Sequence, residues 1–166
     1  MKYSHIIWTS YLTWLPHEKR GKWDSLIKLY SSLSEKFEVK FSKSLCNIYN
    51  NEIQNNRVVF SASDIKNLKD SILELSRNDR ISGDLDILAI DINSTEVQIL
   101  VKGEFEEIKQ KISRLKSRSA TELSFTYKDK INESAKHTWS KGIWVSEFNE
   151  HEDVFKISSY ISNHCT

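Results

Sequence analysis

Hydrophobic and polar positions along the chain follow two spacings, one of about two residues and one of about 3.6, which are typical of strands and helices. Alternation of apolar and polar positions predicts strands over 3–12, 85–93, 97–101 and 143–148. Apolar residues at helical spacing predict a helix over 23–37. Three further predicted helices have core faces made of Ile65, Leu68, Ile72 and Leu75, of Phe105, Ile108, Ile112 and Leu115, and of Val154, Ile157 and Ile161.

Turn and capping residues separate these elements. Ser61 followed by Asp64 resembles a capping box and predicts where the second helix begins. The short connection 94–95 predicts that the strands on either side of it pair as an antiparallel hairpin. Residues 38–60 give no clear period; their asparagines indicate a loop, with a short strand at 58–60 as an alternative.

The order of these elements predicts an α+β fold, with a central antiparallel sheet and helices packed on it. This order is typical of ferredoxin-like and RRM-like domains. We expect one domain over 1–166, with an inserted helical and loop segment at about 22–60. A pattern of this kind defines a fold class and leaves the function open.

Charge and cysteine content restrict the conclusions about partners and compartment. The chain has 24 Lys and Arg against 23 Asp and Glu, so a nucleic-acid site would have to rest on a local cluster of basic residues. Cys46 and Cys165 have neither metal-ligand nor disulfide spacing, which fits a reducing cytoplasm. No apolar run approaches the roughly 18 residues that span a membrane, so we expect no membrane partner.

Three separated segments of the chain share their residues with one known family. They are 9–16 (TSYLTWLP) followed by Arg20-Gly21, 115–120 (LKSRSA), and 139–145 (WSKGIWV) followed by 160–164 (YISNH). In this order and spacing they resemble the single-tyrosine transposases of the HUH superfamily, which include REP-associated tyrosine transposases and insertion-sequence transposases. The resemblance covers nearly the whole chain and implies the HUH-transposase fold, with DNA as the partner.

The resemblance also implies where an active site would lie. In the family, two histidines separated by one residue bind a divalent metal, but these positions hold Glu96 and Gln98 here. Their oxygens are ligands for Mg²⁺ or Mn²⁺. Tyr160 falls at the position of the nucleophile, and His164 lies one helical turn later, where relatives place a third metal ligand. Glu96, Gln98 and His164 are therefore the candidate metal ligands, and Tyr160 is the candidate catalytic residue.

Basic residues gather on the long predicted helix. Lys111, Arg114 and Arg118 are spaced so that they share one helix face. Lys116 and Arg118 also belong to the segment that resembles the family, in which this region engages a hairpin or a single-stranded end. Together with Arg20 in the preceding basic turn, these residues form a candidate phosphate track for DNA.

Each of these features also has a structural interpretation. Tyr160 can be a core aromatic, Glu96 and Gln98 the solvated face of a strand, and the basic residues a solvated helix face. Three functions stay open. The first is a protein that recognises hairpin or single-stranded DNA with weakened or lost nicking, which the missing histidines favour. The second is an active metal-dependent DNA nickase and strand transferase that uses Tyr160. The third is a protein-interaction module of a mobile-element or defence system. A homodimer is compatible with the resemblance.

Overall fold

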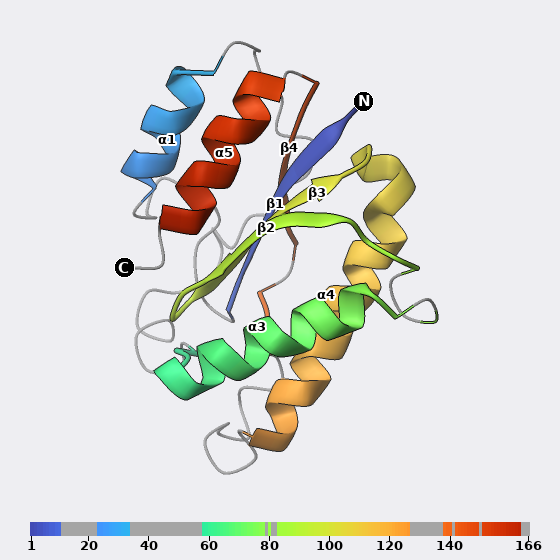
Figure 1. Ribbon diagram of the computed structural model, residues 1–166. Helices are drawn as coiled ribbons and strands as arrows, with labels where there is room; N and C mark the ends of the chain where they lie inside the picture. Colours follow the sequence, from blue (N-terminus) through green and yellow to red (C-terminus); the bar gives the residue numbers. More distant parts are fainter. Residues whose placement is uncertain are drawn as a thin grey trace.

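The computed structural model describes residues 1–10, 23–33, 58–78, 80, 83–126, 138–140, 142–149 and 151–163. Helices and strands follow one another along these residues in the predicted order (Figure 1). Their bounds are β1 Tyr3–Thr9, α1 Asp24–Ser31, α3 Ala62–Ser76, β2 Ile87–Ile92, β3 Glu96–Lys102, α4 Phe105–Thr126, β4 Trp144–Phe148 and α5 His151–Asn163.

The strands form one antiparallel sheet in the order β2-β3-β1-β4. The first strand is therefore central, and in its register Ile7 pairs with Gln98 of β3 on one side and with Trp144 of β4 on the other. The hairpin predicted around 94–95 is the β2–β3 pair. The α+β class and the ferredoxin-like order of the sheet are thus confirmed.

Helices cover both faces of the sheet. Figure 1 shows α1 and α5 on one side and α3 and α4 on the other. Successive residues of a strand point to opposite faces, so β1 contributes Ile6 and Trp8 to the core under α3 and α4, and Tyr3 and Ile7 to the core under α1 and α5. Every residue of β1 is buried, including His5. A polar side chain on this strand must therefore find its partners inside the protein.

Local sequence signals explain how the helices begin. Ser61 and Asp64 form the predicted capping box at the start of α3. Gly103 separates β3 from α4 with a φ of 135°, a conformation that side chains disfavour, and a Cβ atom there would lie 3.0 Å from Ile108. The first free amide of α4, at Phe105, donates to the Glu147 carboxylate of β4. None of the described helices is long and apolar enough to cross a membrane.

Three predictions differ from the structure by three residues or more. Helix α1 ends at Ser31, where Ser32 caps it, and not at 37. The first strand ends at Thr9, and Ser10 continues as an isolated bridge to Trp139. The segment 58–60 is not a strand; the Phe60 amide donates to the Ser94 carbonyl (2.8 Å) and Ser10 Oγ donates to the Val58 carbonyl (2.6 Å). These bonds join the segment to the strand ends without a ladder.

Candidate active site and nucleic-acid interface

Tyr160 lies on α5 and is partly buried against the core between this helix and the sheet. Its hydroxyl is 3.2 Å from Ser25 Oγ of α1. Burial raises the pKa of the Tyr160 hydroxyl, the Ser25 and Gln98 side chains oppose this by hydrogen bonding, and the charges of Glu96 and Asp91 raise it further. The structure therefore brings Tyr160 together with both altered metal positions, as the resemblance implies, and adds the carboxylate of Asp91.

Glu96 and Gln98 lie on the same face of β3 and are bound to each other. Gln98 Nε2 donates to Glu96 Oε1 over 2.7 Å. Gln98 is only 1% exposed, so the interpretation of this strand face as solvated is wrong for Gln98. Asp91 lies directly opposite Gln98 in the β2–β3 register and is also buried. The site thus gathers two carboxylates and an amide in a poorly solvated place.

A buried histidine lies behind Gln98, on the next strand of the sheet. His5 Nδ1 is 2.6 Å from the Tyr30 hydroxyl of α1, and the two rings stack with centroids 5.9 Å apart. Burial lowers the pKa of His5 to about 3, opposed by hydrogen bonding to the Gln98 side chain, so His5 is neutral near pH 7. Burial also raises the pKa of the Tyr30 hydroxyl, so Tyr30 keeps its proton.

The contact between Gln98 and Glu96 determines how the Gln98 amide is oriented. A carboxylate only accepts, so the amide nitrogen of Gln98 must face Glu96 and its Oε1 is turned away from Glu96. Gln98 Oε1 and His5 Nε2 are both buried without a hydrogen-bond partner among the described residues. If Tyr30 donates to Nδ1, the proton of neutral His5 lies on Nε2, on the side of the sheet where Gln98 lies. We refer to Tyr30, His5, Gln98 and Glu96 as the buried relay.

The buried relay affects whether these residues can hold a metal. Members of the family are generally metal-dependent, but no group of three His, Cys, Asp or Glu in the described part of the chain could hold an ion. Gln98 directs an N–H, and not its oxygen, toward Glu96, so a cation there would require the amide to turn over. As they lie, Glu96 and Gln98 do not fit a divalent metal. His164, the third candidate ligand, lies outside the described residues.

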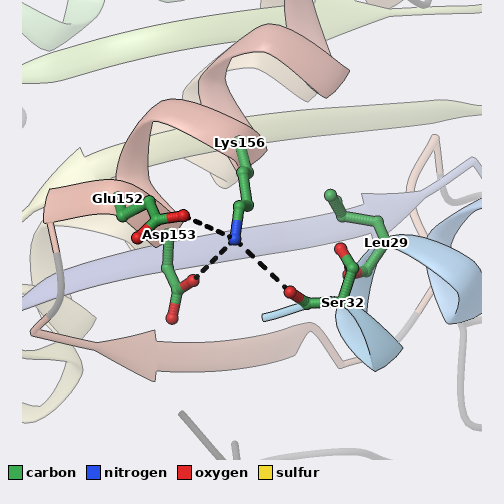
Figure 2. Close-up of polar contacts among 5 residues, drawn as sticks. All are labelled: Leu29, Ser32, Glu152, Asp153 and Lys156. Carbon is green, nitrogen blue, oxygen red and sulfur yellow. Dashed lines mark hydrogen bonds and ion pairs between the residues drawn. The ribbon is translucent and has the colours of Figure 1, made fainter. Parts of the chain in front are cut away.

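Helix α1 holds α5 in place over the sheet through a lysine on α5. Lys156 Nζ lies 3.1 Å from Glu152, 3.9 Å from Asp153 and 3.4 Å from the Ser32 carbonyl at the end of α1 (Figure 2). Asp153 is fully buried, which fixes this end of the contact. The two helices are thereby held side by side, with Tyr160 beside Ser25.

The basic residues of α4 fall into two groups. Lys111 Nζ donates to the Gly83 carbonyl (2.6 Å), and Lys116 Nζ donates to the carbonyls of Ser140 (2.8 Å) and Gly142 (2.6 Å). Burial lowers the pKa of Lys116 to about 8. These two ammonium groups bind the backbone that leads into β2 and β4. A DNA contact by either lysine stays a prediction.

Arg114 and Arg118 are exposed on α4, on the sheet face opposite Tyr160. The residues predicted for one active site and one DNA track therefore lie in two places separated by the sheet. Arg20 lies outside the described residues. His5, Tyr30 and Asp91 were missed from the sequence; a lone histidine within an apolar strand was the signal that could have found His5.

A ferredoxin-like sheet with Tyr160 on its last helix, over a strand that carries Glu96 and Gln98 with one residue between them, is the layout that the resemblance to single-tyrosine transposases implies. Residues 51–164, more than half of the chain, match the family model described as "Transposase IS200 like". The chain belongs to this family of IS200-like transposases. Its function is of the transposase type, in transposition and DNA recombination, with DNA as the partner. A comparison with curated proteins found no match.

Proposed function

We propose that the chain recognises hairpin or single-stranded DNA on an IS200-like transposase fold in which nicking is weakened or lost. The observation that carries this proposal is the hydrogen bond from Gln98 to Glu96. The two positions that hold the metal in the family are bonded to each other here, with the amide nitrogen of Gln98 directed toward Glu96. A binding function needs none of these groups to change.

The surroundings of Tyr160 support the same conclusion. A tyrosine attacks a phosphodiester most readily as the phenolate, and burial together with Glu96 and Asp91 raises the pKa of Tyr160. The same two carboxylates repel the negatively charged phosphate that Tyr160 would attack. A divalent cation would reverse both effects, but Gln98 as it lies directs an N–H, and not its oxygen, toward Glu96.

A second candidate is an active nickase and strand transferase, which the proximity of Tyr160 to Glu96, Gln98 and Asp91 favours. In this version the Gln98 amide turns over, and Glu96, Gln98 and His164 hold Mg²⁺ or Mn²⁺. The metal would polarise the scissile phosphate, and Tyr160 would supply the nucleophile. The two candidates differ in whether a covalent protein–DNA product forms.

Labelled single-stranded hairpin DNA, incubated with Mg²⁺ or Mn²⁺, separates the two candidates. We expect a salt-sensitive shift on a native gel and little or no covalent product on a denaturing gel. Tyr160→Phe removes the candidate nucleophile, and Tyr3→Phe is the matched control, because it removes a tyrosine hydroxyl bonded to Met1 instead. A covalent band lost only in Tyr160→Phe would establish the nickase. Neither band nor shift would favour a protein partner.

A further inference from the structure

Helix α1 is an addition to the frame that builds the sheet. The frame consists of β1, α3, β2, β3, α4 and β4, which form a complete ferredoxin-like unit with α3 and α4 on one face. Helix α1 lies on the opposite face, beside the tyrosine helix α5 (Figure 1). It also lies outside residues 51–164, which match the family model. The role of α1 is therefore to be sought in its contacts on the face that carries Tyr160.

Two polar contacts join α1 to α5, one at each end of α1. At the beginning of α1, Ser25 Oγ lies 3.2 Å from the Tyr160 hydroxyl. At its end, the Ser32 carbonyl accepts from Lys156 Nζ over 3.4 Å (Figure 2). The earlier residue of α1 thus meets the later residue of α5, so the two helices run antiparallel. Helix α1 lies along the part of α5 that carries Tyr160 and is attached to it at both ends.

The Tyr160 hydroxyl lies between α1 and the sheet. It is contacted from α1 by Ser25 and from β3 by the side chain of Gln98. Helix α1 is itself seated on the sheet through Tyr30, whose ring meets Trp144 of β4 edge to face with centroids 5.3 Å apart. Both Tyr30 and Tyr160 belong to the core on this face. Helix α1 therefore covers the tyrosine hydroxyl from the side that does not face the sheet.

Helix α1 has little stability of its own. It has only eight residues, whereas an isolated helix shorter than roughly 12 residues is marginal in water. Among the described residues, the side chain of its N-cap residue, Trp23, makes no hydrogen bond to the first turn. Its folded state thus depends on the contacts with α5 and the sheet, and elements of this kind open locally while the rest of a domain stays folded. Opening of α1 leaves the frame intact.

We propose that α1 is a strap that closes over Tyr160 and limits access to its hydroxyl. In the closed state Ser25 lies against the hydroxyl, and a phosphodiester has to displace α1 before it can align with the phenol oxygen. Opening of the strap separates Ser25 from Tyr160 and leaves the sheet in place. This inference goes beyond the proposed function, because the strap is a second barrier to nicking that does not depend on Glu96 or Gln98.

N-acetylimidazole, which transfers its acetyl group to accessible tyrosine hydroxyls, tests the strap without DNA or metal. Lys28 is exposed within α1, and Lys28→Pro breaks the helix there, because proline lacks the amide hydrogen and clashes with the preceding turn. Lys28→Ala is the matched control, because it removes the same charged side chain and keeps the helix. We expect the acetylation rate of Tyr160, measured by peptide mass spectrometry, to rise roughly tenfold or more in Lys28→Pro only. Tyr3, which packs on Phe148 instead, should stay slow in all three proteins.

The other outcomes reject the strap or are decided by a second measurement. A wild-type Tyr160 that reacts as fast as in the unfolded chain would show that α1 does not cover it. An unchanged rate in Lys28→Pro would show that α1 does not control access. If Tyr3 reacts as fast as Tyr160 in Lys28→Pro, the domain has unfolded, and hydrogen exchange of the wild-type protein decides. The α1 amides should then exchange roughly tenfold or more faster than those of β3, and equal protection rejects the strap. Because no DNA is present, failure of the strap leaves the proposed function standing, and absence of DNA binding leaves the strap standing.

Discussion

The two faces of the sheet use charged and polar residues in opposite ways. Under α1 and α5, polar groups are buried and bonded to one another, as in the 2.7 Å contact between Gln98 and Glu96. Under α3 and α4 the core is apolar, and Arg114 and Arg118 are left exposed beside Arg80. The first face carries the positions that the family resemblance assigns to an active site, and the second carries exposed cations that form no ion pair with another described residue.

Under the proposed function, this difference is how one fold would lose a reaction and keep a binding surface. A metal site requires several ligands that present lone pairs to one point, so a single inward-turned amide is enough to disable it. A phosphate surface depends on charge and tolerates small displacements, because guanidinium groups act over several ångströms. We therefore expect perturbations of the first face to change chemistry and stability, and perturbations of the second to change DNA affinity.

The largest expected effect comes from restoring the histidine pair, which would make the first face chemically competent. Glu96→His/Gln98→His replaces a carboxylate and an amide by neutral imidazoles that bind divalent metals. It also removes a negative charge close to Tyr160. We expect Mn²⁺-dependent covalent protein–DNA product to rise roughly tenfold or more on a denaturing gel. Adding Tyr160→Phe should abolish the product. If the product does not rise, factors other than the two ligands prevent nicking.

The first face also shows what sequence alone could and could not provide. The period-two spacing of Glu96 and Gln98 correctly placed both on one side of a strand, and helical spacing correctly gave the buried faces of α3, α4 and α5. That the face is buried could not be read from the alternation, because a half-solvated and a fully covered strand can share the same pattern. Gln98 is buried because β3 is an inner strand of the sheet and α5 packs on this face.

The other features that the sequence did not predict are contacts between residues far apart in the chain. His5 and Tyr30 are 25 residues apart, and neither lies in the segments that carry the family resemblance. Lys116 belongs to such a segment, but which way its ammonium group turns depends on carbonyls at 140 and 142. Lys111 likewise donates to the carbonyl of Gly83, which lies 28 residues before it in the chain. The spacing of residues along the sequence determines which side chains share a helix face, whereas these long-range contacts depend on the tertiary fold.

Acidification should destabilise the protein through His5, the next largest effect. The pKa of His5 is about 3 in the folded protein against 6.5 ordinarily, so the unfolded chain binds more protons between these values. Stability is therefore complete above pH 6.5 and is lost as the pH falls toward 3, by about 3 kcal/mol at pH 4. Chemical denaturation from pH 7 to pH 4 measures this loss. A His5→Phe variant should lack this component, and equal pH slopes for both proteins would refute it.

Removing the hydroxyl of Tyr30 should have a smaller effect on the same face. Tyr30→Phe leaves His5 Nδ1 buried without its 2.6 Å partner, which should lower the free energy of unfolding by about 1–3 kcal/mol. The double variant Tyr30→Phe/His5→Phe should lose less than the sum of the two single changes, because both partners are then apolar. Denaturant unfolding of all four proteins measures this coupling. Additive losses would show that the two side chains act independently.

The smallest expected effects come from two neighbouring basic residues of α4. Lys116 is turned toward the protein backbone, whereas Arg118 is exposed. Arg118→Gln should reduce the salt slope of DNA binding by about 1, with no change in melting temperature, because its guanidinium is exposed. Lys116→Gln should instead lower the melting temperature and leave the slope unchanged, since its ammonium group binds the carbonyls of Ser140 and Gly142. Anisotropy titrations and thermal melts of both variants separate the two roles. A reduced slope in Lys116→Gln would place this lysine among the DNA contacts and join the two groups of cations into one track.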